Sequence, residues 1–317
     1  MQPTLFGSPA ATNGFRDSSF AKNKNLPLHR WVPWIAGFSA DFVDDAIEKY
    51  LPERNGESWV LDPFAGVGTT LVESYLSGLN VIGFEINPYA ALATKIKLNA
   101  MRISVHDLTA RIATFERFME KAETGRLKRD PRSQAPIGFS GRTQLFSPKV
   151  QRKVLYALDF ISSIEDSTLR DIFRLGLGSV MVSFSNYSYE PSLTRRAAVG
   201  KTNIEEANVG LIVSAKLHLM LEDIGWAEAH MRTLGYRPKA RVCRFPRSTE
   251  NAESSPVGVR LVRLRYPGTT FSNRRAYKGA LARRDTCSSR VLPIQRHFQL
   301  CAEPLPDYSL AHQRRTS

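Results

Sequence analysis

The chain has 317 residues, 42% of them apolar, which is enough for the core of one large domain or two modest ones. No run approaches the roughly 18 to 20 uninterrupted apolar residues of a membrane span, and residues 1–20 lack the features of a signal peptide, so we expect a cytoplasmic protein that makes no membrane contact. The three cysteines, Cys243, Cys287 and Cys301, are too far apart for a paired-thiolate zinc motif and indicate no disulfide framework, so we expect no metal site.

The formal net charge of +14 favours a polyanionic partner, because each phosphate that a cation neutralises releases condensed counterions. This charge is unevenly distributed along the chain. Residues 239–317 hold 16 of the 44 Lys and Arg residues but only 5 of the 30 Asp and Glu residues. The composition therefore predicts an irregular, basic C-terminal tail over 239–317.

The N-terminal part begins with a polar stretch. Residues 1–28 are rich in Gly, Ser, Asn and Lys and are predicted to be a loose lead-in. Helical spacing of apolar residues then runs from Phe38 to Leu51, where Pro52 ends it. The acidic residues of this helix are interpreted as its solvated face. They are Asp41, Asp44, Asp45 and Glu48.

Two short apolar runs predict buried strands. The first covers residues 59–61 and is closed by Asp62, and the second covers residues 81–84 and ends at Glu85. Runs this short, bounded by turn signals, suit strands that are covered on both faces.

A helix is predicted after each of these strands. The first runs from Thr69 to about Ser77, and the second covers residues 87–99, with Asn87 as its cap and Pro88 in its first turn. Alternation of strand and helix within about 45 residues is typical of a parallel α/β sheet.

From residue 103 to residue 238 the pattern is mostly helical. Apolar residues three to four apart predict four helices. They cover residues 108–122, 148–164, 169–177 and 204–234. A polar stretch over 125–141 separates the first two. This region is predicted to be a long helical insertion in the α/β fold.

The turn between the first strand and its helix carries the chemistry. Its sequence is Asp62-Pro63-Phe64-Ala65-Gly66-Val67-Gly68-Thr69-Thr70. Glycines let a ligand approach the backbone, and the start of a helix offers free N–H groups. Glu85 ends the next strand, where a carboxylate can accept hydrogen bonds from both ribose hydroxyls of a nucleoside. The pattern predicts an adenosine-containing cofactor, and the alternative is a tight turn beside a solvated carboxylate.

The residues after the glycines disfavour two other nucleotide sites. A dinucleotide site has a third glycine three residues after the second, and Leu71 occupies that position. A nucleoside triphosphate site has a lysine after its last glycine, whereas Gly68 is followed by Thr69.

The turn, together with Gly83-Phe84-Glu85-Ile86-Asn87-Pro88, resembles the S-adenosylmethionine-binding motifs of the DNA methyltransferases that methylate adenine N6 or cytosine N4. Residues 29–39 are similar to the segment that, in this family, precedes the first strand and closes over the methionine end of the cofactor. The resemblance covers residues 29–100, about a quarter of the chain. It implies S-adenosyl-L-methionine as the cofactor, while His29 is assigned no chemical role. The implied cofactor-binding residues are Asp62, Pro63, Phe64, Ala65, Gly66, Gly68, Thr69, Thr70, Glu85, Ile86 and Asn87.

The resemblance also implies a Rossmann-like methyltransferase core over 29–102 and target recognition by the insertion over 103–238. It implies double-stranded DNA as the substrate and a restriction nuclease as a partner. Six basic residues are candidate phosphate contacts, and the alternative is a solvated basic surface. They are Arg126, Lys128, Arg129, Arg132, Arg195 and Arg196.

The catalytic element of this family is missing. The family pattern is Asp/Asn/Ser-Pro-Pro-aromatic, which holds the target amine and stacks on a base turned out of the duplex. None of the 18 prolines here is adjacent to another, so the catalytic residues stay unassigned. The nearest substitute lies in residues 180–191, where Asn186 and Tyr187 are candidates to hold and stack a base. We favour the alternative that this segment is a loop capping a buried helix.

A change of reading frame is a second explanation for the missing element. Beyond about Val242 all three cysteines appear, 14 of the 16 basic residues after position 238 are Arg, and hydrophobic periodicity fades. Residues 257–267 lie where the family has its catalytic strand and loop, and they are interpreted as a displaced frame of that element. The alternative is a genuine arginine-rich arm that binds phosphates.

Two rival functions remain open. The first is methylation of RNA or of a small molecule, because one fold hosts many acceptors. The second is a catalytically inactive remnant that binds cofactor or nucleic acid, which the missing Pro-Pro element favours.

Overall fold

The computed structural model describes residues 15–34, 37–53, 56–134, 145–189 and 193–244. The predictions for Cys287, Cys301, the segment 257–267 and the basic tail beyond residue 244 lie outside these residues. Among the described helices none is long and apolar enough to cross a membrane.

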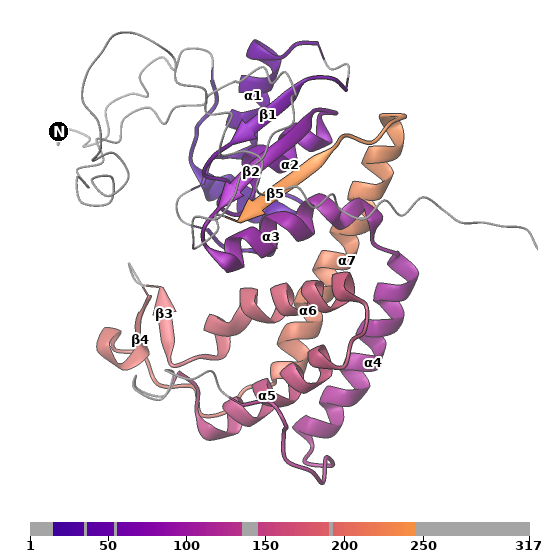
Figure 1. The fold of residues 1–317 in the computed structure, drawn as a ribbon. Helices are drawn as coiled ribbons and strands as arrows, with labels where there is room; N and C mark the ends of the chain where they lie inside the picture. Colours follow the sequence, from indigo (N-terminus) through magenta and orange to yellow (C-terminus); the bar gives the residue numbers. More distant parts are fainter. Residues whose placement is uncertain (1–14, 35–36, 54–55, 135–144, 190–192, 245–317) are drawn as a thin grey trace, which may run out of the picture.

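A three-stranded parallel sheet lies at one end of the molecule (Figure 1). Strand β1 (Trp59–Asp62) pairs with β2 (Asn80–Glu85), and β2 pairs with β5 (Ala240–Arg244). Both pairings are parallel, so the three strands end at the same edge. The two strands predicted from the sequence and the parallel α/β class are confirmed.

Three helices accompany the sheet, and each begins at a residue suited to that position. Helix α1 (Ala40–Tyr50) is capped by the side chain of Ser39, and α3 (Pro88–Asn99) is capped by that of Asn87. Helix α2 (Thr69–Leu76) follows Gly68, which has a left-handed backbone. α2 contacts β1, β2, α1 and α3, whereas α3 contacts β2 and β5.

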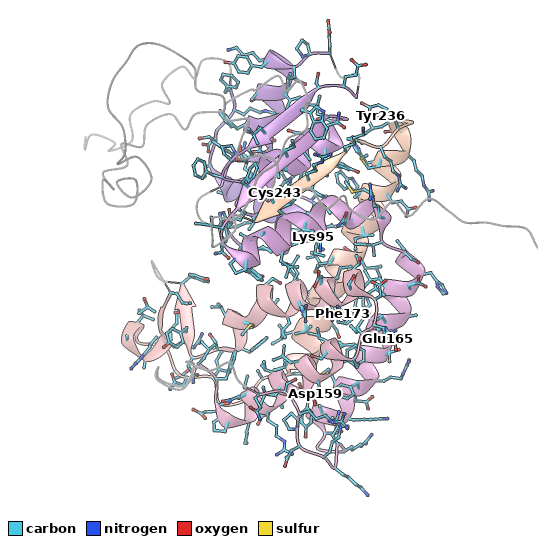
Figure 2. The ribbon with its side chains drawn as sticks, in the orientation of Figure 1. Lys95, Asp159, Glu165, Phe173, Tyr236 and Cys243 are labelled. Atoms are coloured by element: carbon cyan, nitrogen blue, oxygen red, sulfur yellow. The ribbon has the colours of Figure 1, made fainter. Side chains whose placement is uncertain are left out.

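Four helices form a separate helical unit at the other end of the molecule (Figure 1). They are α4 (Val105–Glu123), α5 (Pro148–Ser162), α6 (Ser167–Val180) and α7 (Val209–Thr233). Three phenylalanine rings, Phe115, Phe160 and Phe173, lie within 6 Å of one another in its core, and Figure 2 labels Phe173 there. α7 leads directly back to β5, so the unit is inserted between α3 and the third strand.

Short elements complete the described chain. The 3-10 helices are η1 (Phe20–Asn25), η2 (His29–Trp31), η3 (Ala100–Arg102), η4 (Met181–Phe184) and η5 (Arg196–Val199). A small antiparallel hairpin consists of β3 (Tyr187–Tyr189) and β4 (Leu193–Arg195).

Residues 15–28 differ from the expected loose lead-in, because they are bonded to α1. The guanidinium of Arg16 lies 2.8 to 3.2 Å from the carboxylates of Asp41, Asp44 and Asp45. The side-chain amide of Asn23 accepts from the N–H of Ala40, at the start of the same helix. The acidic face of α1 is therefore partly neutralised by the lead-in rather than left to solvent.

Residues 240–244 differ from the expected irregular tail, because they form β5. Ala240 and Val242 pack against the core, and the guanidinium of Arg241 lies 5.9 Å from the ring centre of Trp59. Cys243 is buried, and Figure 2 labels it on this strand. A strand of five residues has too short an alternation to stand out from its arginine-rich surroundings.

Candidate cofactor site

The turn after β1 is tied to the end of β2 by backbone hydrogen bonds. Asp62 lies opposite Gly83 in the parallel register, so the two strands end close together. The N–H of Ala65 donates to the carbonyl of Phe84 at 2.9 Å. The carboxylate of Asp62 accepts from the N–H of Phe64 at 2.9 Å and so closes the first part of the turn.

Only glycine suits two positions of this turn. Gly66 has φ +53° and Gly68 has φ +85°, both in the left-handed region that side chains disfavour. A Cβ on Gly68 would lie 2.8 Å from the side chain of Thr94, and a Cβ on Gly66 would lie 3.3 Å from Nε1 of Trp34. The turn thus packs tightly on α3 on one side and lies beside the segment predicted to close over the cofactor on the other.

Glu85 contacts the glycine turn directly. Its Oε2 accepts from the N–H of Gly66 at 2.8 Å, and its Oε1 accepts from the N–H of Asn87 at 2.7 Å. A carboxylate can accept about four hydrogen bonds, so two remain available to a ligand. The structure brings the two sequence motifs together at one edge of the sheet.

The electrostatic character of this edge is acidic. Burial raises the pKa of Asp62, and the nearby Glu85 carboxylate raises it further, while hydrogen bonds from Phe64 and Thr70 lower it. Two carboxyl groups at one edge favour a ligand that carries positive charge, because that charge relieves their mutual repulsion.

Two large apolar side chains flank the acidic pair. Phe64 is 78% exposed and Ile86 is 75% exposed, although most apolar side chains of comparable size are buried in the described chain. Each lies within two residues of one of the carboxylates. Exposed apolar side chains beside polar groups are typical of a ligand-binding surface. The hydroxyl of Thr69, at the start of α2, is buried and has no hydrogen-bond partner in the described part of the chain.

Two residues of α3 that belong to no sequence motif described above bind the backbone of the turn. The hydroxyl of Thr94 donates to the carbonyl of Gly66, and Nζ of Lys97 donates to the carbonyl of Val67, both at 2.9 Å. Lys97 is fully buried, and this burial lowers its pKa to about 7. A polar pair three residues apart in an otherwise apolar helix face was the available signal.

The segment beside the turn is anchored to the helical unit by one buried carboxylate. Asp223 of α7 accepts from the N–H of Leu28 and from Nε1 of Trp31, each at 2.8 Å. Its other oxygen lies 2.6 Å from the guanidinium of Arg30. Leu28 has φ +64°, a strained value for a residue other than glycine. These bonds fix η2, which ends three residues before Trp34, the residue whose indole lies beside Gly66.

His29 and Asn186 are occupied by structural contacts. Nε2 of the buried His29 lies 2.5 Å from the carboxylate of Glu73, and burial is the main cause of its lowered pKa. The side-chain oxygen of Asn186 accepts from the N–H of Ile204 at 3.0 Å and so fixes the loop beside β3. Tyr187 begins β3 and is half-buried. These contacts agree with a packing role, and we assign no chemistry to them.

The candidate phosphate contacts do not form one cluster. Arg126, Arg129 and Arg132 line one groove of the helical unit. Arg195 and Arg196 lie at β4 and η5, where the guanidinium of Arg196 donates to the carbonyl of Thr202. Over the described residues, no three or more His, Cys, Asp or Glu side chains are arranged to hold a metal ion.

Comparisons with known proteins give matches to part of this chain. A family model described as "DNA methylase", for N6 and N4 methyltransferases, matches residues 13–95. Type II methyltransferase M.AvaI of Nostoc sp. (strain PCC 7120 / SAG 25.82 / UTEX 2576) is 43% identical over 53 residues, which are 17% of this chain and 11% of that protein. Type II methyltransferase M.BsoBI of Geobacillus stearothermophilus is 40% identical over 52 residues, 16% of this chain and 10% of that protein.

The matched segment thus spans about a tenth of the length of these relatives. No solved structure matches the chain. Residues 13–95, which the family model matches, contain the glycine turn, Glu85 and most of α3. Residues 13–95 of this chain are therefore similar to the amino-methylating DNA methyltransferases.

Proposed function

We propose that the chain binds S-adenosylmethionine at the edge formed by the glycine turn and Glu85, and that it serves methyl transfer to an exocyclic amino group of a DNA base, adenine N6 or cytosine N4. The observation that carries the proposal is the 2.8 Å hydrogen bond between Glu85 and the N–H of Gly66. It joins the two motifs that a nucleoside cofactor has to contact together. The family match over residues 13–95 supports the same reading.

The side chains at this edge fit the parts of that cofactor. Glu85 would accept the ribose hydroxyls, and Phe64 and Ile86 would flank the adenine ring. The carboxylate of Asp62 would face the positive charge of the methionine part. The buried Thr69 hydroxyl, which has no partner among the described residues, would gain one from the ligand.

The bound cofactor supplies an electrophilic methyl group on a sulfonium centre. The residues of this chain would bind and orient it and leave the methyl accessible to an acceptor nitrogen aligned with the S–C bond. The absence of adjacent prolines in the sequence favours a second candidate, a cofactor-binding protein that does not turn over. We extend the first proposal to a cytoplasmic modification enzyme paired with a restriction nuclease.

Calorimetric titration with S-adenosylmethionine tests the site. Glu85→Ala is expected to weaken binding by about 2 kcal/mol, roughly 30-fold in Kd, because two charge-assisted hydrogen bonds are lost. Phe64→Ala is a second variant that avoids any folding defect, since the ring is 78% exposed, and it is expected to weaken binding by about tenfold. Glu165→Ala, an exposed position between α5 and α6, is the control and should bind as the wild type does. Unchanged affinity in both site variants would overturn the proposed site.

Transfer of a labelled methyl group separates the candidate functions. Labelling of unmodified duplex DNA, with little labelling of RNA of the same sequence, is the expected result. Labelling of RNA alone would overturn the choice of substrate. Tight cofactor binding without transfer to either polymer would establish the inactive remnant.

A further inference from the structure

A basic groove lies at the end of the helical unit that is farthest from the sheet. Its volume is about 920 Å³, and Figure 2 labels one of its residues, Asp159, in that part of the molecule. The groove is bounded by α4, by α5 and by the segment after α4. Six cationic side chains line it, and only two carboxylates do. The cations are Arg111, Arg117, Lys121, Arg126, Arg129 and Arg132.

The three cations of α4 all line the groove, and Arg117 and Lys121 are one helical turn apart. Successive members are six and four residues apart, which corresponds to about 9 Å and 6 Å along the helix axis. None of the three has a carboxylate within 4 Å in the described part of the chain, although Arg117 donates to the hydroxyl of Thr114. Uncompensated like charges on one helix oppose folding, and a bound polyanion removes that opposition.

The other wall of the groove is held in place by hydrogen bonds, most of them to the buried carboxylate of Asp159. Asp159 has only 6% of its side chain exposed, and it accepts from the N–H groups of Arg132 and Ser133 at 2.9 and 2.7 Å. It also binds the guanidinium of Arg129 at 3.2 Å, and the hydroxyl of Tyr156 donates to the carbonyl of Arg129 at 2.6 Å. The backbone that carries the basic side chains is therefore ordered before any ligand binds, which reduces the entropy lost on binding.

We propose that this α4–α5 groove binds the phosphodiester backbone of duplex DNA. Five of its six cations are arginines, whose planar guanidinium suits two-point contact with phosphate. The six cations come from α4 and from the segment after it, so they are spread over the groove, which suits a polyanion with several phosphates better than a single small phosphate ligand. The choice of DNA as the polyanion rests on the proposed function, whereas the assignment of the groove rests on its charges and contacts.

The test is the salt dependence of binding to a duplex of random sequence. The slope of log K against log salt concentration is negative, and each lost phosphate contact lowers its absolute value by about 0.9. The triple variant Arg111→Gln, Arg117→Gln, Lys121→Gln is expected to lower that absolute value by about 2 to 3 units and to weaken binding at least about 30-fold at 0.1 M salt. Gln is a good helix former, so the fold should survive, and a thermal melt verifies this.

A matched control removes the same charge elsewhere. Lys149→Gln, Arg174→Gln, Arg232→Gln changes three exposed cations of α5, α6 and α7 that do not line the groove. It should leave the slope within about half a unit of the wild type. An equal loss in the control would show that only total charge matters and would overturn the groove.

Two further measurements separate the groove from the proposed function. S-adenosylmethionine should bind the groove variant as it binds the wild type, and failure of the wild type to bind it would remove the proposed function but not the groove. Stronger groove-dependent binding to single-stranded RNA, or to vesicles containing anionic lipid, than to duplex DNA would overturn the choice of occupant.

Discussion

The candidate site at the sheet end is shaped by backbone groups, whereas the groove of the helical unit is shaped by side chains on helix surfaces. At the sheet end the backbone itself shapes the site: two glycines with positive φ, carbonyls held from beneath by α3, and N–H groups bonded to Glu85. In the helical unit, amphipathic helices pack around a cluster of phenylalanine rings, and the charged groove lies on their outer surface. A site shaped by backbone tolerates few substitutions, whereas a charged helix surface tolerates many.

The two regions meet at Asp223. This residue belongs to α7 of the helical unit, yet its carboxylate accepts hydrogen bonds from Leu28, Arg30 and Trp31, which precede Trp34. The cofactor site and the helical unit are therefore joined by the ion pair of Asp223 with Arg30 in addition to the packing of α3 on α6 and of α7 on η3.

The largest effect is expected from breaking this junction. Asp223→Ala leaves the N–H of Leu28, the indole N–H of Trp31 and the charge of Arg30 without their partner, which is expected to cost about 3 kcal/mol or more of unfolding free energy in urea titrations. Glu222→Ala is the control on the same helix. It also lies near Arg30, at 3.5 Å, but its side chain is 74% exposed, so the loss should stay below about 1 kcal/mol. Similar values for both variants would show that Asp223 does not join the regions.

Lys97 is expected to make stability depend on pH. Its pKa is about 7 in the folded protein because of burial, and the ordinary value of 10.5 applies in the unfolded chain. Between these values the unfolded state binds a proton that the folded state does not, so stability rises with pH, by at most about 1.4 kcal/mol per unit. Urea titrations from pH 6.5 to 9.5 should show this rise in the wild type and a smaller rise in Lys97→Met.

A second lysine provides the comparison for that measurement. Burial lowers the pKa of Lys216 to about 8, and this side chain donates to the carbonyl of Arg30. Lys216→Met should therefore reduce the slope only above about pH 8, where this group loses its proton in the folded state. A wild-type curve that stays flat from pH 7 to 9.5 would contradict both assignments.

Alanine at a left-handed glycine should cost more at the sheet end than in the helical unit. Gly68 and Gly125 have φ +85° and +70°, but only at Gly68 would a Cβ meet a neighbour within 4 Å. We expect Gly68→Ala to lower the free energy of unfolding by about 2 kcal/mol and Gly125→Ala by about 1 kcal/mol, because the second substitution introduces only backbone strain. Cofactor affinity should fall for Gly68→Ala alone, and a fall in both would indicate a general effect on folding.

The smallest effect is expected at helix caps. Asn87 caps α3 and Asp166 caps α6, each through a side-chain oxygen that accepts a backbone N–H. Replacement of either by alanine should cost about 1 kcal/mol in thermal or urea unfolding. Only Asn87→Ala should also weaken cofactor binding. Alanine keeps the backbone N–H that donates to Glu85, but loss of the side-chain cap loosens the backbone that positions this N–H.

Most elements of the fold could be predicted from local patterns. The strands at 59–61 and 81–84 and the helices of the insertion appear within a few residues of their predicted ends. β5 was missed because its alternation is short, and the order of residues 15–28 was missed because polar side chains there bond to a distant acidic face. Neither feature has a signal within its own stretch of sequence.

Local sequence patterns suffice to predict the glycine turn, the carboxylate at the end of the next strand and the helices that follow, because turns, caps and periodic apolar residues act over distances of a few residues. Three further features follow only from the packing of distant elements: Lys97 binds the turn, Asp223 holds a segment 195 residues earlier in the chain, and the cations of α4 share a groove with those after it. Such contacts depend on how whole helices pack, and burial in that packing sets the pKa of Lys97 and makes the hydrogen bonds of Asp223 costly to lose.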